Sequence, residues 1–273
     1  SDLPDIRYAQ NENVDRGDLR MQVIERGTST PIDDAKISIS YSGDPDSTVE
    51  EVNTDASGMS ETLTLDTPPL ELSMQPSEVQ PYAEYTIQVT AKGYRPINIS
   101  GIEVFSGQLS LQEIRMDAEK ATESMTDNIV IPAHTLFAEY PPKIAEAEIK
   151  PVTETGEIVL SRVVIPEYVI VHDGAPSDPT ARDYYVRYRD YIKNVASSEI
   201  YSTWPDATIR ANVLAIMSFT LNRVYTEWYR NKGYSFTITS STAYDQKFMY
   251  GRNIYQSISD VVDEMFQNYL SKI

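Results

Sequence analysis

Residues 18–117 carry the pattern that most restricts the fold, because short runs of alternating apolar and polar residues are separated by turn sequences. The apolar positions are Leu19, Met21 and Val23, then Ala35, Ile37, Ile39 and Tyr41, then Leu63 and Leu65, then Tyr85, Ile87 and Val89. A period of two residues is typical of strands with one buried face. Turn sequences lie between the runs, at 42–46, 54–58, 92–94 and 106–108. The segment is therefore predicted to form an antiparallel β-sandwich of about 100 residues.

Four motifs of this segment support the prediction by their order. They are P-I-D-D-A-K-I-S-I at 31–39, T-D-A-S-G at 54–58, Y-T-I-Q-V-T-A-K-G-Y at 85–94 and V-F-S-G-Q at 104–108. In this order they resemble the carboxypeptidase regulatory-like (transthyretin-like) β-sandwich. The resemblance implies an accessory module without chemistry of its own, in which Asp55 and Gly58 form a turn.

The second half of the chain changes to a helical pattern after Asp183. Apolar residues recur every three or four positions at Ile209, Val213, Ile216, Thr220, Val224 and Trp228. This spacing predicts one long amphipathic helix of about 25 residues, with Pro205 in its first turn and Gly233 as its C-cap. Residues 234–239 alternate like a short strand. A second helix is expected after Arg252, with an inner face made of Ile258, Val261, Val262, Met265, Phe266 and Tyr269.

The predicted fold class is therefore an α+β multidomain protein, in which an antiparallel β-sandwich is followed by a mainly helical domain with a few short strands. The expected segments are an N-terminal arm at 1–17, the sandwich at 18–117, a proline-rich extended segment at 118–180 and the helical domain at 181–273. The proline-rich segment is expected to pack between the domains, because its apolar runs are poorly suited to a free linker.

Composition excludes several classes of site. The 273 residues include no cysteine, which rules out disulfides, thiolate zinc sites and cysteine nucleophiles. His134 and His172 are the two histidines, so a histidine-rich metal site is disfavoured and no metal or cofactor is expected. His172 is interpreted as structural, because neighbouring side chains such as His172 and Asp173 rarely face each other.

Charge is divided unevenly along the chain. Residues 1–150 hold 27 acids against 11 bases and residues 151–273 hold 14 against 12, which together give the net charge of −18. The acidic first part disfavours binding to nucleic acid and to anionic membranes, whereas the second part could approach a polyanionic surface such as a cell wall. No run is long and apolar enough for a membrane span, and the N-terminus does not resemble a signal peptide. An exported protein would therefore need a signal that this sequence does not include.

Glu199 is the strongest candidate for a catalytic residue. It lies six residues before Pro205, among Ile200, Tyr201 and Trp204, where partial desolvation would raise the pKa of its carboxyl group. A carboxylic acid with a raised pKa suits a general acid that protonates the leaving oxygen of a glycosidic bond. The alternative is a structural acid at the start of the long helix, which interacts with the helix dipole or with Arg189 or Arg210.

Three motifs around this acid resemble the SpoIID/LytB family of stage II sporulation protein D and amidase-enhancer domains. They are Y-I-x-x-V-x-x-x-E-x-x-x-x-W-P at 191–205, R-A-N-x-x-A with S-F at 210–219, and D-Q-x-x-x-Y-G at 245–251. The resemblance implies a protein of the bacterial cell envelope or exterior that binds or cleaves peptidoglycan glycan strands, or that stimulates a cell-wall amidase. It places the catalytic glutamate at Glu199, and the substrate-binding candidates are Tyr201, Trp204, Asn212, Asp245, Gln246 and Tyr250. Trp228 is assigned to packing.

Three functions stay open from the sequence. The first is a lytic transglycosylase, in which Glu199 serves as the single acid/base because the sugar's own 6-hydroxyl attacks. The second is a non-catalytic module that binds peptidoglycan or positions an amidase. It is favoured by Asn212 and Met217, which replace a glutamine and an arginine of the family pattern, and by the end of the sequence at Ile273, before the family's Q-W-G segment. The third is a structural or assembly protein with two interaction domains.

Overall fold

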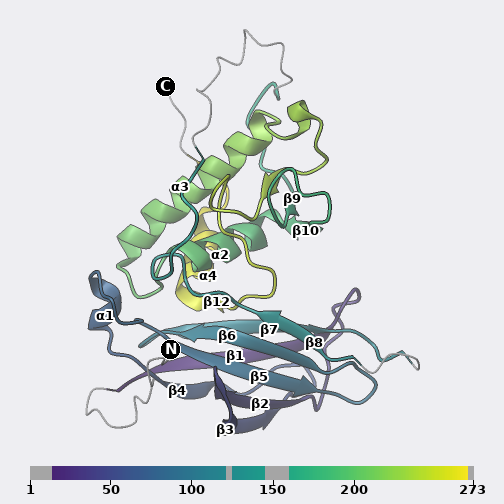
Figure 1. The fold of residues 1–273 in the computed structure, drawn as a ribbon, viewed down its shortest axis with the longest axis vertical. Coiled ribbons are helices and arrows are strands. Elements are labelled where there is room, and N and C mark those ends of the chain that lie inside the picture. The colour runs from purple at the N-terminus through teal and green to yellow at the C-terminus, as the bar shows by residue number, and fades with distance from the viewer. Residues whose placement is uncertain (1–13, 121–124, 145–159, 270–273) are drawn as a thin grey trace. The chain divides into compact units, whose positions relative to one another are not determined.

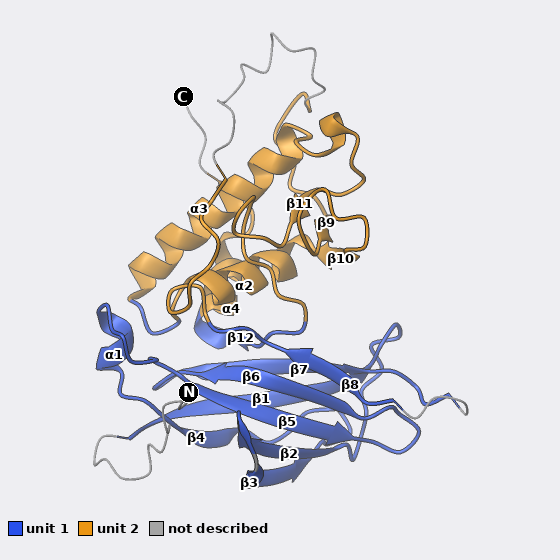
Figure 2. Ribbon diagram, in the orientation of Figure 1, with its two compact units in different colours: residues 1–133, 202–204, 251–257 blue, residues 134–201, 205–250, 258–273 orange. Residues whose placement is uncertain are grey.

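The computed structural model describes residues 14–120, 125–144 and 160–269 (Figure 1). The chain forms two compact units (Figure 2). Unit 1 comprises 1–133, 202–204 and 251–257, and unit 2 comprises 134–201, 205–250 and 258–273. Most of the expected N-terminal arm, residues 121–124 and 145–159 of the expected proline-rich segment, and residues 270–273 of the expected helical domain lie outside the described residues.

Unit 1 contains two sheets. Their strands are β1 (Asp15–Glu25), β2 (Lys36–Tyr41), β3 (Asp44–Asn53), β4 (Leu63–Thr67), β5 (Ala83–Thr90), β6 (Ile97–Val104), β7 (Leu109–Met116), β8 (Asp127–Val130) and β12 (Ile254–Tyr255). One sheet has the order β12-β7-β1-β4 and the other β3-β2-β5-β6-β8. A short helix, α1 (Glu71–Met74), follows β4. Apart from Ala35, which immediately precedes β2, the apolar residues of the predicted runs lie in β1, β2, β4 and β5, so the prediction of strands at these positions is confirmed.

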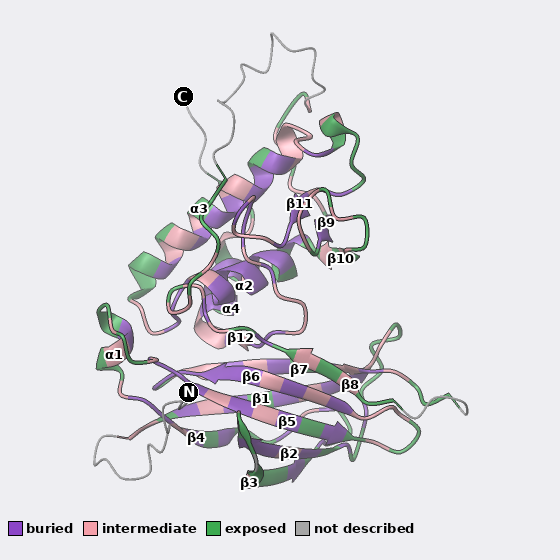
Figure 3. Ribbon diagram, viewed as in Figure 1, coloured by how far each residue is buried: buried purple, intermediate pink, exposed green. Residues whose placement is uncertain are grey.

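The two sheets enclose one hydrophobic core, which is the arrangement of a β-sandwich. Leu19, Met21 and Val23 of β1 and Ile37 and Ile39 of β2 are fully buried in it (Figure 3). Tyr41, the last residue of the second predicted run, is instead exposed at the end of β2. The alternation in the sequence therefore identifies the buried face of both sheets.

The prediction of a purely antiparallel sandwich is wrong. β1 pairs with β7 in parallel, from Asp18 opposite Leu109 to Glu25 opposite Met116, and β6 pairs with β8 in parallel. Antiparallel pairing is favoured where a tight turn joins two neighbouring strands. No such turn joins the strands of either pair: five strands separate β1 from β7 in the sequence, and β7 separates β6 from β8.

The turn at 54–58 confirms the role expected for Asp55 and Gly58. Asp55 Oδ1 accepts hydrogen bonds from the backbone N–H groups of Ser57 and Met59, at 2.8 and 3.0 Å. Gly58 has a φ of 71°, and a Cβ atom there would lie 2.4 Å from the carbonyl oxygen of Val23. The turn thus needs glycine both for its conformation and for its close approach to β1.

Gly58→Ala is expected to lower the free energy of unfolding of unit 1 by at least about 2 kcal/mol, because the added methyl group meets backbone atoms that cannot move away cheaply. Gly93→Ala is the matched control: Gly93 has a φ of 85°, but nothing lies within 4 Å of a Cβ atom there. It should cost about 1 kcal/mol. Urea denaturation of both variants measures the difference, and equal losses would contradict the role of the close approach.

Residues 251–257 belong to unit 1 although they come near the end of the chain. β12 pairs with the edge strand β7, and it thereby covers an edge that would otherwise expose backbone hydrogen-bonding groups. Arg252 donates to Glu103 Oε2 at 3.0 Å, and the hydroxyl of Tyr255 donates to the same oxygen at 2.6 Å. All three side chains are buried, and burial raises the pKa of Glu103 despite the nearby guanidinium. Buried polar contacts therefore fix this distant segment in unit 1.

Unit 2 is built from helices and one small sheet. Its elements are β9 (Tyr168–His172), β10 (Asp183–Arg187), α2 (Tyr188–Glu199), α3 (Asp206–Tyr225), the 3₁₀ turn η2 (Arg230–Lys232), β11 (Ile238–Thr239) and most of α4 (Gln256–Met265). The sheet has the order β10-β9-β11, with β11 parallel to β9. Buried faces of α2 and α3 form much of the interior of the unit (Figure 3).

The long helix α3 is shorter than predicted, at 20 residues. It ends at Tyr225, so Trp228 lies beyond the helix and is half-buried rather than part of its apolar stripe. Gly233, with a φ of 87°, caps η2 instead of α3. The early end follows from Glu227, whose left-handed backbone, with a φ of 48°, cannot continue a helix.

Helix α4 agrees with the prediction over its first turns only. Ile258, Val261 and Val262 are buried, as expected, whereas Tyr269 lies beyond the end of the helix and is exposed. In the part of the chain that the structure describes, no helix combines the length and the apolar character that crossing a membrane requires.

Candidate functional site

Glu199 is the last residue of α2, a helix that was not predicted from the sequence. The carboxyl group therefore lies at the C-terminal end of a helix, where the dipole disfavours a negative charge. Neither arginine proposed as a structural partner pairs with it: Arg189 contacts Asp263, and Arg210 contacts Asp206 and Glu264. The alternative of a helix-start acid is thus wrong in its geometry.

The loop that holds Asp245 and Gln246 contacts α2 at two positions. Glu199 Oε1 accepts a hydrogen bond of 2.7 Å from the backbone N–H of Lys247. Five residues earlier, the side-chain amide of Asn194 donates to the carbonyl of Met249 at 2.8 Å and accepts from the N–H of Met249 at 2.9 Å. The first and last of the resembling motifs therefore meet at Glu199.

The pKa of Glu199 is raised from 4.5 to about 7, mainly because the carboxyl group is desolvated by burial. The hydrogen bond from Lys247 and the positive charge of Lys143 act in the opposite direction and are outweighed. Close to pH 7 both protonation states are populated, so the group can give up a proton and accept one. The neighbouring apolar residues predict an upward shift of this pKa, and the direction is confirmed.

Lys143 and Lys247 each lie close to the face of an aromatic ring. Lys143 Nζ lies 4.4 Å from the centroid of Phe219, and Lys247 Nζ lies 5.4 Å from the centroid of Tyr140. Among the described residues, no other carboxylate contributes to the raised pKa of Glu199. Within the described ranges, no three histidine, aspartate or glutamate side chains are arranged to hold a metal ion. The geometry therefore offers one acid/base group with one nearby cation, the ammonium of Lys143.

Asp245 and Gln246 are buried, and their hydrogen bonds lie within unit 2. Asp245 pairs with Arg223 Nε at 2.7 Å, and it accepts hydrogen bonds from the hydroxyl of Tyr229 and from both the N–H and the hydroxyl of Thr239. These contacts hold the loop in place, so Asp245 is suited to position the N–H of Lys247.

Gln246 connects the loop to two helices. Its Oε1 accepts from the hydroxyls of Tyr191 on α2 and Thr220 on α3, at 3.1 and 2.9 Å, and its Nε2 donates to the carbonyl of Ile216 at 3.1 Å. Direct binding of substrate by Gln246 stays a prediction; the structure shows it joining α2, α3 and the loop next to Glu199.

The other predicted binding residues each have different contacts. Tyr201 is buried and packs on the ring of His134, with centroids 4.7 Å apart. Trp204 belongs to unit 1, where its Nε1 donates to the carbonyl of Ser73 at 3.0 Å. Asn212 donates to the carbonyl of Thr208 in its own helix, and Tyr250 stacks on Tyr184 at 4.5 Å. Of the four, Tyr250 is the one that follows the loop at Glu199.

Both histidines have structural contacts. His134 Nδ1 accepts from the N–H of Leu136, so its Nε2 donates to the carbonyl of Ile200, and the hydroxyl of the adjacent Thr135 donates to the carbonyl of Ser198. These contacts satisfy carbonyl groups at the end of α2, on either side of Glu199. His172 pairs with Asp183 at 2.7 Å, rather than with its neighbour Asp173.

The raised pKa of Glu199 makes the stability of unit 2 depend on pH. Because the pKa of Glu199 is higher in the folded chain than in the unfolded chain, the folded state binds the proton more tightly, and stability falls as pH rises from 4.5 to about 7. Glu199→Gln removes this loss, so it should stabilise unit 2 at pH 8 by roughly 1–3 kcal/mol and have little effect at pH 4. Thermal unfolding of both proteins across this range measures the difference. A constant difference at all pH values would contradict the shift.

The comparisons with known proteins identify no family. The chain matches no protein-family model and no curated protein. Among solved structures, the Bacillus anthracis TIE protein is 15% identical over 38% of this chain and 17% of that chain, with a TM-score of 0.27. Klebsiella pneumoniae 5-hydroxyisourate hydrolase is 17% identical over 38% of this chain and 92% of that one, with a TM-score of 0.25. Acinetobacter radioresistens catechol 1,2-dioxygenase is 13% identical over 43% and 58%, with a TM-score of 0.26.

At these TM-scores the likenesses carry no argument about fold or activity. The β-sandwich of unit 1 is established by its own sheets and core. Its resemblance to the carboxypeptidase regulatory-like module, and that of the second half to the SpoIID/LytB family, stay predictions.

Proposed function

We propose that unit 2 binds peptidoglycan glycan strands in the bacterial cell envelope and cleaves them as a lytic transglycosylase, with Glu199 as the general acid/base. The observation that supports this function best is the carboxyl group of Glu199, which is desolvated to a pKa of about 7 and oriented by the N–H of Lys247. A group of this kind matches the demand of glycosidic bond cleavage near neutral pH.

The chemistry needs only one carboxyl group. Glu199 donates its proton to the glycosidic oxygen as the bond between this oxygen and C1 breaks. The 6-hydroxyl of the same sugar attacks C1, and the Glu199 carboxylate accepts the hydroxyl proton, which closes an anhydro ring and restores the acid. No water is consumed, so the second carboxylate of a hydrolase is not required.

The neighbouring residues have supporting roles in this proposal. The N–H of Lys247 fixes one carboxyl oxygen and leaves the other to act on the substrate. Lys143, whose charge reaches Glu199, would attract the carboxylates of the cell wall to the site. Asp245 and Gln246 are positioning residues, because they hold the loop that provides the N–H.

The test is incubation of isolated glycan strands with the chain, followed by mass spectrometry of the products. Transglycosylation gives anhydro-sugar ends, which are one water lighter than the reducing ends that hydrolysis would give. Anhydro ends support the proposal and reducing ends contradict it. Glycan that binds without being cleaved would favour a binding or amidase-positioning module, and no affinity at all would favour a structural protein.

A further inference from the structure

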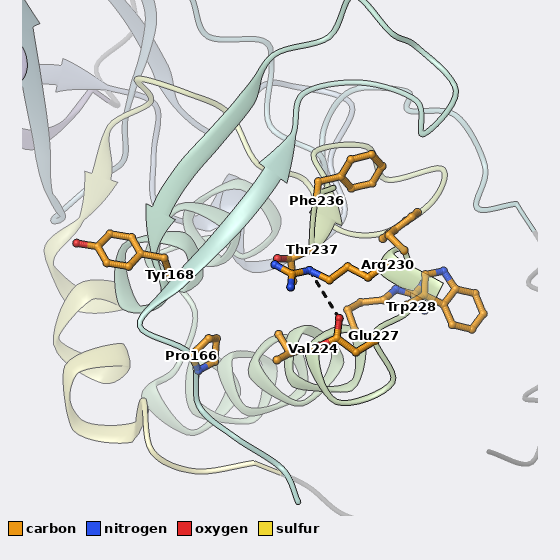
Figure 4. A pocket seen from close by; sticks show the side chains of 10 residues that line it. Pro166, Tyr168, Val224, Glu227, Trp228, Arg230, Phe236 and Thr237 are labelled. Carbon is orange, nitrogen blue, oxygen red and sulfur yellow. Dashed lines mark ion pairs between the residues drawn. The ribbon is translucent and has the colours of Figure 1, made fainter. Parts of the chain in front are cut away.

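Unit 2 contains a pocket of about 190 Å³ that the proposed function does not use. It lies where α3 ends and is lined by Tyr168, Glu227, Trp228, Arg230 and Phe236, among others (Figure 4). Glu199 is not among the lining residues. The volume corresponds to about six water molecules, which suits an amino acid or a very short peptide better than a chain of sugars.

Glu227 occupies a backbone position that normally holds glycine. The N–H of Glu227 donates to the carbonyl of Val224, and the N–H of Trp228 donates to the carbonyl of Arg223, which together form a Schellman motif at the end of α3. The φ of Glu227 is 48°, a conformation that is strained for any residue with a Cβ atom. Six residues later, the left-handed position at the end of η2 is occupied by a glycine, Gly233. A glutamate kept under strain at a pocket wall indicates that its side chain serves a purpose there.

Glu227 and Arg230 bring opposite charges to the same wall. Arg230 Nε lies 3.6 Å from Glu227 Oε2, which is beyond hydrogen-bond length, and the guanidinium side chain is 56% exposed. Figure 4 shows the arginine extending between Glu227 and Thr237. A loose pair of this kind contributes little stability itself, so both groups can exchange their contact for the charges of a ligand.

The aromatic lining does not offer an open platform for a sugar ring. The ring of Trp228 already carries two cations, with Arg223 at 4.4 Å and Lys232 at 3.5 Å from its centroid. Phe236 is buried and stacks on His172 at 4.3 Å. These rings supply apolar walls, so the polar contacts that recognise a ligand would come from the charged pair of Glu227 and Arg230.

We propose that this pocket binds the zwitterionic backbone of an amino acid or short peptide, with the ligand carboxylate on Arg230 and the ligand ammonium on Glu227. Charge-assisted hydrogen bonds to both groups would fix the orientation of the ligand, and the side chains of Val224 and Tyr168 would contact its apolar part. The inference does not depend on the chemistry at Glu199.

The test uses alanyl-alanine as the probe, in its L,L and D,D forms, with Trp204→Phe as the background, so that Trp228 is the one remaining tryptophan. Titration should give a saturable change in tryptophan fluorescence. The N-acetylated and the C-amidated dipeptides, which each lack one charge, should bind at least about tenfold more weakly. Glu227→Gln and Arg230→Gln should weaken the binding of alanyl-alanine to a similar extent. Asp206→Asn, at the opposite end of α3, should leave this binding unchanged.

Glu227→Gly separates binding from folding. It relieves the strained backbone, so the Tm should rise by roughly 2–4 °C, while dipeptide binding is lost. The proposal is overturned if alanyl-alanine gives no saturable signal at millimolar concentration. It is also overturned if the blocked dipeptides bind equally well, or if N-acetylglucosamine saturates the signal and the dipeptide does not.

Discussion

Glu199→Gln is expected to reduce the release of anhydro ends from glycan strands by about 10²- to 10⁴-fold, because the amide cannot donate the proton that the leaving oxygen needs. The substitution preserves the shape of the side chain, and its amide oxygen can still accept the hydrogen bond from Lys247. Binding of the strands should therefore change little. Product analysis by mass spectrometry measures the rate, and co-sedimentation with glycan strands measures the binding.

The pH profile gives an independent check on the same residue. With a pKa of about 7, Glu199 loses its proton as pH rises above neutrality, so kcat/KM should fall about tenfold for each further pH unit. Glu264→Gln is the matched control, because Glu264 is exposed and pairs with Arg210 on the surface of unit 2. Cleavage that persists in Glu199→Gln, or that is equally reduced in the control, would contradict the assignment of Glu199 as the general acid/base.

Asp245→Asn is expected to lower the free energy of unfolding of unit 2 by about 3–5 kcal/mol, because it leaves the buried guanidinium of Arg223 without a compensating charge. The side chains of this pair are 2% and 0% exposed. The amide would also place its own donor against the guanidinium of Arg223, or against the N–H and the hydroxyl of Thr239. Urea denaturation, with amide hydrogen exchange in α2 and α3 as the readout, measures the loss.

Asp206→Asn is the control for this effect. Asp206 pairs with Arg210 in the first turn of α3, but its side chain is 68% exposed, so the loss should not exceed about 0.5 kcal/mol. If Asp245→Asn is as stable as the parent and fails only in glycan binding, Asp245 contacts the substrate directly, and the structural role assigned to it here is wrong.

Much of unit 1 could be predicted from the sequence, because its strands alternate and alternation depends only on local order. Leu19, Met21 and Val23 point into the core of the sandwich as a period of two requires. The parallel pairing of β1 with β7 could not be predicted in this way, since it joins segments about 90 residues apart without a turn to signal it. The same holds for β12, whose place beside β7 depends on contacts such as that between Arg252 and Glu103.

In unit 2, the end of α3 shows why the apolar spacing predicted too long a helix. The apolar spacing continues to Trp228, but Glu227 ends the helix by adopting a left-handed backbone, and glutamate gives no sequence signal for that conformation. Helix α2 was missed for a related reason. Its buried face includes polar residues such as Asn194, Ser197 and Ser198, which hide the apolar period.

The sequence by itself determined the strands of the sandwich, the exclusion of cysteine chemistry and the choice of Glu199 as an acid in apolar surroundings. These properties depend on residue type and near neighbours. Only the tertiary structure decided that Glu199 ends a helix, that the loop at 245–250 supplies the N–H that orients it, and that Asp245 is neutralised by Arg223. Desolvation, ion pairing and hydrogen-bond geometry depend on groups brought together from distant parts of the chain, and local order does not encode those distances.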